Sequence, residues 1–211
     1  MYKIKLDYIF KFFKYHIIIY VKTKIQLMSI QLDKVQPKNK IQLEQLIGYA
    51  FKHNIYDLNF IDTSKITDMS NLFANCEYDI DVSNWDVSNV TNMYNMFYFC
   101  VNFNCDLSNW NVSNVTDMYS MFIVCENFKG KGLENWDVSN VKDIGSMFAG
   151  CENFNCDLSN WDMSNVTDMG YAFIDCEKFK GKGLENWNVS NVTSMRRMFD
   201  GCNKLTIPDW Y

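Results

Sequence analysis

Most residues with chemically reactive side chains recur in a repeating pattern, and few lie outside it. The 211-residue chain has two histidines, His16 and His53, and both precede the repeats. Acid–base and triad catalysis rely most often on histidine, so this distribution removes most such chemistry. Carboxylates are plentiful, but they recur in every repeat, whereas a catalytic site should occur once. The sequence therefore predicts a protein that is not an enzyme and has no cofactor.

Cysteines are the other chemically active residues, and their even number could signal disulfides. Six of the eight occupy one position of successive repeats: Cys76, Cys100, Cys125, Cys151, Cys176 and Cys202. Side chains stacked in parallel do not point at one another, so a column of buried free thiols is favoured over disulfides. Cys105 and Cys156 lie five residues after Cys100 and Cys151. These two pairs could bridge or bind a metal, but without histidine, reactivity towards oxidants is favoured over a metal site.

A tandem repeat of about 25 residues must position all of these side chains. Tryptophan recurs at 85, 110, 136, 161 and 187, each time in a Trp-x-[Val/Met]-Ser-Asn-Val block. The connectors at 103–110 and 154–161 alternate with those at 128–136 and 179–187, so a double unit of 51 residues is duplicated.

Within a repeat, the apolar spacing changes from two, at Trp110 and Val112, to a helical spacing over 118–125. This pattern predicts a short strand followed by a short helix. A hydroxyl and a carboxylate at the start would cap that helix. The expected caps are Thr67, Thr91, Thr116, Thr167 and Thr193, with Asp68, Asp117, Asp143 and Asp168.

One repeat cannot bury its apolar face, so the repeats must stack, each strand pairing with the same strand of the next. The predicted fold is an α/β repeat solenoid with one strand and one helix per turn and a parallel sheet on one face. Its interior ladder is predicted to hold Trp85, Trp110, Trp136, Trp161, Trp187, Phe97, Phe122, Phe148, Phe173 and Phe199.

Three parts are predicted along the chain: a basic segment at 1–38, a capping helix with its lead-in at 39–59, and the solenoid at 60–211. The solenoid holds about six repeats, the last incomplete. Asn39 and Gln42 form an expected cap pair, and residues 39–53 an amphipathic helix. Residues 1–50 carry nine Lys and three Asp or Glu, against eleven Lys or Arg and twenty-two Asp or Glu in 51–211. Acidic repeats argue against nucleic acid.

The basic N-terminal segment leaves several interpretations open. It is compatible with weak contact with an anionic membrane surface, with an ordinary solvated element, or with an upstream extension in which Met28 rather than Met1 is the start. Its apolar run, Ile17 to Val21, is too short to span a membrane, and no cleavage site follows it.

Residues 166–176, Val-Thr-Asp-Met-Gly-Tyr-Ala-Phe-Ile-Asp-Cys, resemble the core of BspA-like, Treponema-type leucine-rich repeats. The Trp-Asp-Val-Ser-Asn-Val-Thr block is more similar to the repeat variant of Mycoplasma-type surface proteins. The resemblance covers about residues 60–211. It implies a leucine-rich-repeat-like, right-handed solenoid, a cell-surface location, and a role in adhesion. The chain shows no lipoprotein signal, so a cytoplasmic location stays open.

The predicted binding face consists of polar side chains that alternate with the buried Trp and Val positions. A row of amides, carboxylates and hydroxyls can bind a protein or a glycan, or can serve only solubility and stacking. The residues are Asn84, Asp86, Ser88, Asn109, Asn111, Ser113, Asn135, Asp137, Ser139, Asn160, Asp162, Ser164, Asn186, Asn188 and Ser190.

The asparagines of Ser-Asn-Val (89, 114, 140, 165 and 191) are instead expected to turn inward and satisfy backbone groups. The leading hypothesis is a non-enzymatic interaction or adhesion module. Its rival is an intracellular scaffold that self-associates through an open edge at the C-terminal end. The sequence leaves the partner, the compartment and the oligomeric state open.

Overall fold

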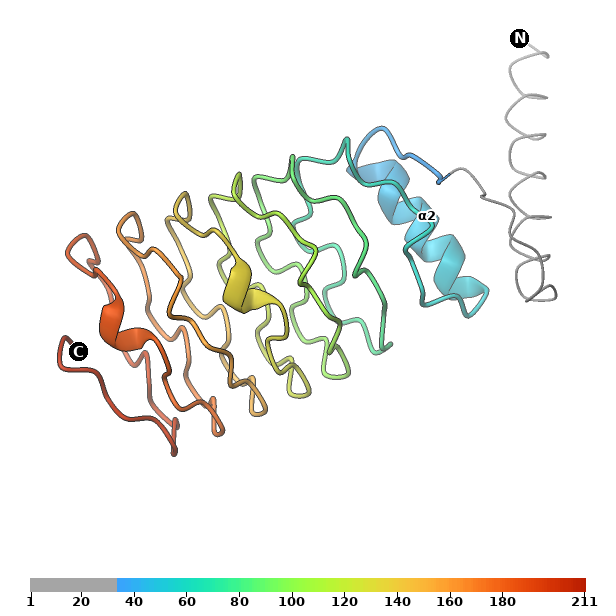
Figure 1. The fold of residues 1–211 in the computed structure, drawn as a ribbon. Helices are drawn as coiled ribbons and strands as arrows, with labels where there is room; N and C mark the ends of the chain where they lie inside the picture. Colours follow the sequence, from blue (N-terminus) through green and yellow to red (C-terminus); the bar gives the residue numbers. More distant parts are fainter. Residues whose placement is uncertain (1–33) are drawn as a thin grey trace, which may run out of the picture. The chain divides into compact units, whose positions relative to one another are not determined.

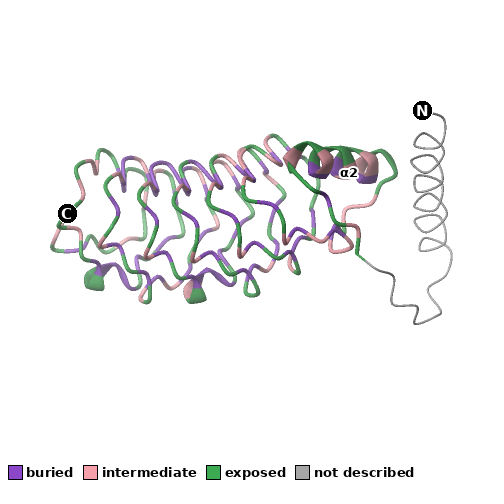
Figure 2. Cartoon of the chain, turned by 90° about the horizontal axis from the view of Figure 1, so that it is seen from above, coloured by how far each residue is buried: buried purple, intermediate pink, exposed green. Residues whose placement is uncertain are grey.

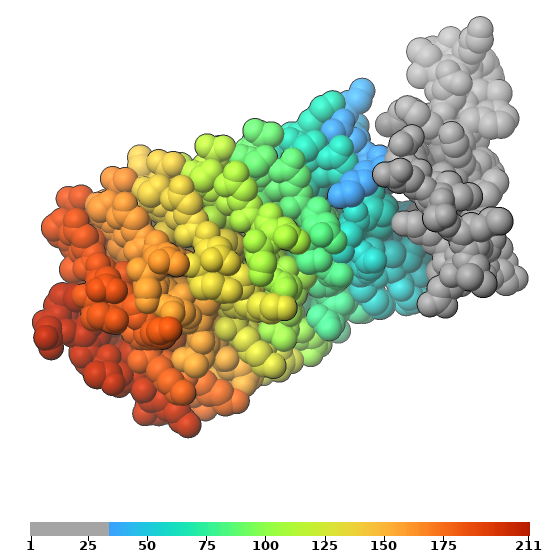
Figure 3. All heavy atoms as spheres, in the orientation of Figure 1, coloured from blue at the N-terminus to red at the C-terminus, as the bar shows by residue number. Residues whose placement is uncertain are grey.

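The computed structural model describes residues 34–211; the predictions for residues 1–33, including the choice between Met1 and Met28, lie outside them. After one helix, the chain winds through successive turns that lie side by side in sequence order (Figure 1). Each turn forms a band across the face seen in Figure 3. We refer to residues 56–211 as the repeat stack.

Helix α2 spans Lys40–Lys52 and precedes the stack. Its first turn is capped reciprocally, because the Asn39 side chain accepts the Gln42 N–H (3.0 Å) and the Gln42 side chain accepts the Lys38 N–H (2.9 Å). Leu43, Ile47 and Ala50 are its buried residues. The helix predicted at 39–53 is therefore present, with the expected cap pair at its start.

The predicted parallel sheet is absent from residues 34–211. Neighbouring turns pair only through isolated parallel bridges, one row of which joins Asp68, Asn92, Asp117, Asp143, Asp168 and Ser194. Apart from α2, the described chain contains only two short 3-10 helices, η1 (Leu133–Asn135) and η2 (Leu184–Asn186), and is mostly coil. The prediction of a leucine-rich-repeat-like α/β solenoid is therefore wrong.

The alternation that predicted a strand comes from two consecutive β-turns. The Trp85 N–H donates to the Val82 carbonyl (3.1 Å), and the Val90 N–H donates to that of Val87 (2.9 Å). Each Ser-Asn pair occupies the centre of a turn, and the apolar residues at its ends point inward. Ser and Asn favour such turns because their side chains bond to nearby backbone groups. The spacing of two, as between Trp85 and Val87, is therefore the junction between the end of one turn and the start of the next.

The helix predicted in each repeat is also a chain of turns, as over 118–125. Met121 and Cys125 donate their N–H groups to carbonyls three residues back, whereas Ser120 and Phe122 donate to carbonyls of the next repeat. Ser120 and Val124 have positive φ, 55° and 56°. A left-handed residue at every fourth position prevents a helix from propagating. The helical apolar spacing arises because each turn advances three or four residues.

The threonines and aspartates that were predicted as helix caps join or shape the turns instead. The Thr116 hydroxyl donates to the carbonyl of Thr91 in the preceding repeat (3.1 Å). Asp117 lies in the row of bridges, and its Oδ1 accepts the Tyr119 N–H (2.9 Å). With no helix to cap, both side chains satisfy backbone groups of coil.

The tryptophans of the repeated block form one column inside the stack. Trp85, Trp110, Trp136, Trp161 and Trp187 are at most 5% exposed. The rings of Trp110 and Trp136 are 6.2 Å apart and nearly parallel, at 1°. Each indole N–H donates to a carbonyl of the preceding repeat, as Trp161 does to Leu133 (2.8 Å). The column is thus buried without leaving a polar group unpaired.

A second column consists of phenylalanines. Its members, at 97, 122, 148, 173 and 199, stack with centroids 5.3–5.9 Å apart. Phenylalanines of the connectors, at 103, 128, 154 and 179, pack against it at 4.0–4.6 Å. Figure 2 shows the result, with buried residues recurring in each turn and exposed ones alternating with them. The core is one continuous array rather than a set of separate cores.

Candidate interaction surface

The predicted binding residues lie on the corners of the turns rather than on a strand face. The Asn column (84, 109, 135, 160 and 186) and the Asp/Asn column (86, 111, 137, 162 and 188) are exposed. In the serine column, Ser190 is exposed and the others (88, 113, 139 and 164) are half-buried. The structure thus brings ten exposed amides and carboxylates into two rows along five turns.

The Asp/Asn column also shapes the turns. Asp86 accepts both the N–H and the hydroxyl of Ser88 on Oδ1 (3.0 and 2.6 Å), and Asn111 accepts the Ser113 N–H (3.1 Å). The same bonds from Ser164 lower the pKa of Asp162. One oxygen of each side chain is therefore committed to the fold, which is the structural role that the sequence left open for this row.

The asparagines of Ser-Asn-Val link successive repeats. Asn114 Nδ2 donates to the Ser88 carbonyl (2.7 Å), and Asn140 Nδ2 to that of Ser113 (2.8 Å). The same bond occurs at 89, 165 and 191. The predicted structural role is confirmed, but the predicted inward orientation is wrong, because these residues are exposed and bond along the outside of the stack.

Six cysteines form a column of thiols beside the phenylalanines. From Cys100 onward, each Sγ donates to the carbonyl of a phenylalanine in the preceding repeat, at 2.9–3.0 Å. Burial raises the pKa of Cys125 and Cys176 well above its usual range. The thiols of Cys125 and Cys176 are therefore neutral, hydrogen-bonded parts of the core.

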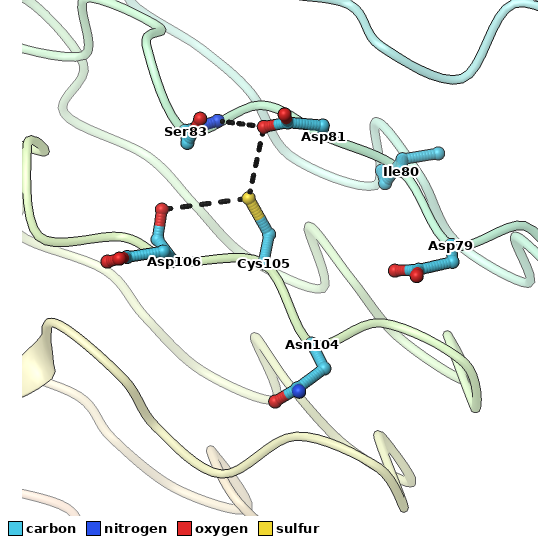
Figure 4. Close-up of a pocket in the computed structure, with 7 residues that line it drawn as sticks. All are labelled: Asp79, Ile80, Asp81, Ser83, Asn104, Cys105 and Asp106. Atoms are coloured by element: carbon cyan, nitrogen blue, oxygen red, sulfur yellow. Dashed lines mark hydrogen bonds between the residues drawn. The ribbon is translucent and has the colours of Figure 1, made fainter.

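The remaining two cysteines each lie against a carboxylate of the preceding repeat. Cys105 Sγ contacts Asp81 Oδ1 and the Asp106 carbonyl (both 3.6 Å), beside an open hollow of about 280 Å³ (Figure 4). Cys156 Sγ contacts Glu134 Oε2 (3.6 Å) in the same way. Burial, and then the adjacent carboxylates, raises the pKa of both thiols to about 12. The structure therefore argues against the predicted reactivity towards oxidants.

We expect Cys105 and Cys156 to react with an aromatic disulfide reagent at pH 8 only as fast as the protein opens. In urea, all eight cysteines should react rapidly. Because the folded pKa of these two thiols is raised to about 12, their contribution to stability is present below the unfolded pKa of about 8.5. It is lost as pH rises through the folded value. A rapid native phase that disappears in the Cys105→Ser/Cys156→Ser variant would contradict this.

No cluster of three or more metal-ligating side chains occurs within residues 34–211. In the same part of the chain, no helix is both long and apolar enough to cross a bilayer. One lysine of each Lys-Gly-Lys-Gly connector is paired: Lys131 contacts Asp106 (2.6 Å) and Lys182 contacts Asp157 (2.5 Å). These ion pairs, with Ser108 and Ser159, lower the pKa of both carboxyls to about 2.

Sequence reasoning missed a set of exposed aromatic side chains on the turns that replace the predicted helix. Tyr94, Phe99 and Tyr119 are 37%, 42% and 37% exposed. Tyr94 and Tyr119 stack in neighbouring repeats at 5.6 Å and 9°. A signal was present, because the equivalent positions of the other repeats are not aromatic: Ser70, Gly145, Gly170 and Arg196 for the tyrosines, and Asn75, Val124, Gly150, Asp175 and Gly201 for Phe99.

These features define a tandem-repeat protein in which coil turns, rather than strands and helices, stack around columns of identical side chains. The chain matches the family model described as "Mycoplasma protein of unknown function, DUF285" twice, over residues 41–132 and 123–210, and it belongs to this family. The match supports the Mycoplasma-type repeat and not leucine-rich repeats specifically. Among curated proteins and solved structures, none matches the chain significantly.

Proposed function

We propose that the chain is a non-enzymatic interaction module that binds a macromolecule, protein or glycan, through the exposed Asn and Asp columns. The observation that carries this proposal is the two exposed rows, which present the same polar groups on five successive turns. A periodic polar array of this kind supplies the area and the hydrogen-bonding groups that an interface needs. Adhesion at a cell surface, which the resemblance to BspA-like repeats implies, is a narrower form of the same proposal.

The test is capture of partners from an extract of the cells that make the protein. Reversing the charge at Asp86, Asp137 and Asp162 (each Asp→Lys) should abolish capture, because three hydrogen-bond acceptors that face the partner in one row would be replaced by cations. The matched control changes three exposed acids outside the row, Glu77, Glu152 and Asp209, to Lys. Equal capture by the row variant and the unchanged protein would count against the proposal.

A rival proposal is a self-associating scaffold that pairs through the last turn the structure describes. In the preceding repeat, the N–H groups of Tyr171, Phe173 and Asp175 donate to carbonyls of the last repeat. The equivalent N–H groups of Arg197, Phe199 and Gly201 have no acceptor within residues 34–211. Comparing the size of the protein in solution with and without residues 203–211 separates the two proposals.

A further inference from the structure

Cys76 differs from the other thiols of its column in what holds its sulfur. From Cys100 onward, each Sγ donates to the carbonyl of a phenylalanine in the preceding repeat. Before Cys76, helix α2 takes the place of that repeat, and its Phe51 ring lies 6.4 Å from Phe73. The backbone acceptor of Cys76 Sγ is instead the Tyr78 carbonyl of its own repeat, at the long distance of 3.8 Å. This thiol is therefore held less firmly than the others.

The thiol of Cys100, in the next repeat, extends towards Cys76. The Phe73 carbonyl accepts both the Cys76 N–H (2.9 Å) and Cys100 Sγ (3.0 Å), so the Cys100 side chain reaches the turn that holds Cys76. The N–H groups of Phe73 and Asn75 join the same two turns, since they donate to carbonyls of the next repeat (2.9 and 2.7 Å). Chains paired in this way lie about 4.8 Å apart, a separation that a disulfide can span.

The two ends of the column of thiols differ in chemistry. Hydrogen bonding to the Cys100 side chain lowers the pKa of Cys76, whereas burial raises the pKa of Cys202, at the other end, to about 11. Exposure follows the opposite order, because Cys76 is 7% exposed and Cys202 is half-buried. Since the thiolate is the nucleophile, ionisation favours reaction at Cys76 and exposure favours reaction at Cys202. The pair thus separates the two effects.

We propose that Cys76 is a thiol-modification site at which a small disulfide drives formation of a Cys76–Cys100 bond. The Cys76 thiolate attacks one sulfur of the small disulfide, so that a mixed disulfide forms and a thiolate leaves. Cys100 then attacks Cys76 Sγ, the bond to the small molecule breaks, and its sulfur leaves with the proton of Cys100. Two protein thiols are oxidised, and the small disulfide is reduced to two thiols. The bond ties two neighbouring repeats together, and it does not depend on the proposed binding function.

The test treats the full chain with oxidised glutathione at mildly alkaline pH, alkylates the remaining thiols, and maps all cysteines by mass spectrometry of peptides. Two of the eight thiols should be lost, and they should be recovered as linked peptides that contain Cys76 and Cys100. Cys76 should react at least about tenfold faster than Cys202, because its larger thiolate fraction outweighs the lower nucleophilicity of a less basic thiolate. Reduction with dithiothreitol should restore all eight thiols.

Two variants identify the order of the steps. Cys100→Ser should stop the reaction at the mixed disulfide, with glutathione on Cys76, whereas the matched control Cys202→Ser should leave the Cys76–Cys100 bond unchanged. Thermal unfolding verifies that each variant is folded, and peptide mapping of the unchanged protein decides if Cys100→Ser is not. Faster reaction at Cys202 than at Cys76, loss of all thiols at one common rate, or eight free thiols after the treatment overturns the inference.

Discussion

Replacing Gly132 with alanine is expected to destabilise the protein by about 3 kcal/mol or more. Gly132 has φ 96° and precedes η1. A β-carbon there would lie 2.2 Å from the backbone N of Ser108 and 2.5 Å from the carbonyl carbon of Leu107. Because these are backbone atoms of the preceding repeat, they cannot rotate away as a side chain would. The two repeats would have to separate, and the left-handed conformation adds a cost of its own.

Urea unfolding followed by circular dichroism measures this loss. Gly183, in the second copy of the double unit, has φ 94° and meets Ser159 N at the same 2.2 Å, so Gly183→Ala should cost a similar amount. Gly48→Ala is the control: no atom lies within 4 Å of its β-carbon, and α2 should gain about 0.5–1 kcal/mol. A cost below about 1 kcal/mol for Gly132→Ala would show that the repeats are not held at this spacing.

Phe122→Ala should cost about 3–5 kcal/mol, through lost burial and the cavity left behind. Phe122 is fully buried in the middle of its column. Its ring stacks on Phe97 at 5.4 Å and on Phe148 at 5.7 Å, and it packs against Phe128 at 4.4 Å. The backbones of Phe97 and Phe148 are held by hydrogen bonds between repeats, so these rings cannot easily move into the cavity.

The control for Phe122 is Phe199→Ala, the same column position in the last repeat. Phe199 stacks on Phe173 at 5.9 Å, and its other ring contacts are Tyr211, edge-on at 4.9 Å, and Trp210 at 6.2 Å. Its loss should cost clearly less than that of Phe122, because Tyr211 is 48% exposed and can shift into the space more easily than a buried ring of the column. Equal costs in urea unfolding would indicate that the column does not transmit packing from repeat to repeat.

The repeat length and the identity of the buried columns could be predicted from the sequence. Trp110 and Phe122 are buried where the recurring apolar positions placed them, because only stacking can remove such periodic apolar surface from water. The helix α2 could be predicted as well, since its cap pair, Asn39 and Gln42, is a local signal. Both signals, the side-chain chemistry of the cap and the spacing of the apolar residues, can be recognised without knowing the path of the chain.

The conformation within each repeat was decided by contacts between repeats. Over 118–125, the apolar spacing fits a helix, but alternate N–H groups donate to the next repeat instead of to the fourth residue back. The Asn and Gly at positions such as Asn95 and Gly150, both with positive φ, were the available signal against a helix. Apolar residues spaced by three or four positions cannot distinguish a helix from a chain of turns, because both structures place the apolar residues on one side.

The candidate site also has features that the sequence predicts and features that depend on contacts between repeats. The sequence by itself determined which residue types recur at equivalent positions of the repeats, and hence that the Asn and Asp rows recur on successive turns. Only the tertiary structure decided that Asp86 commits an oxygen to its turn, that Asn114 bonds along the stack, and that Tyr94 and Tyr119 meet at the surface. The physical reason is that the partner of each of these side chains, or the turn that presents it, is set by the three-dimensional path of the chain rather than by the apolar period.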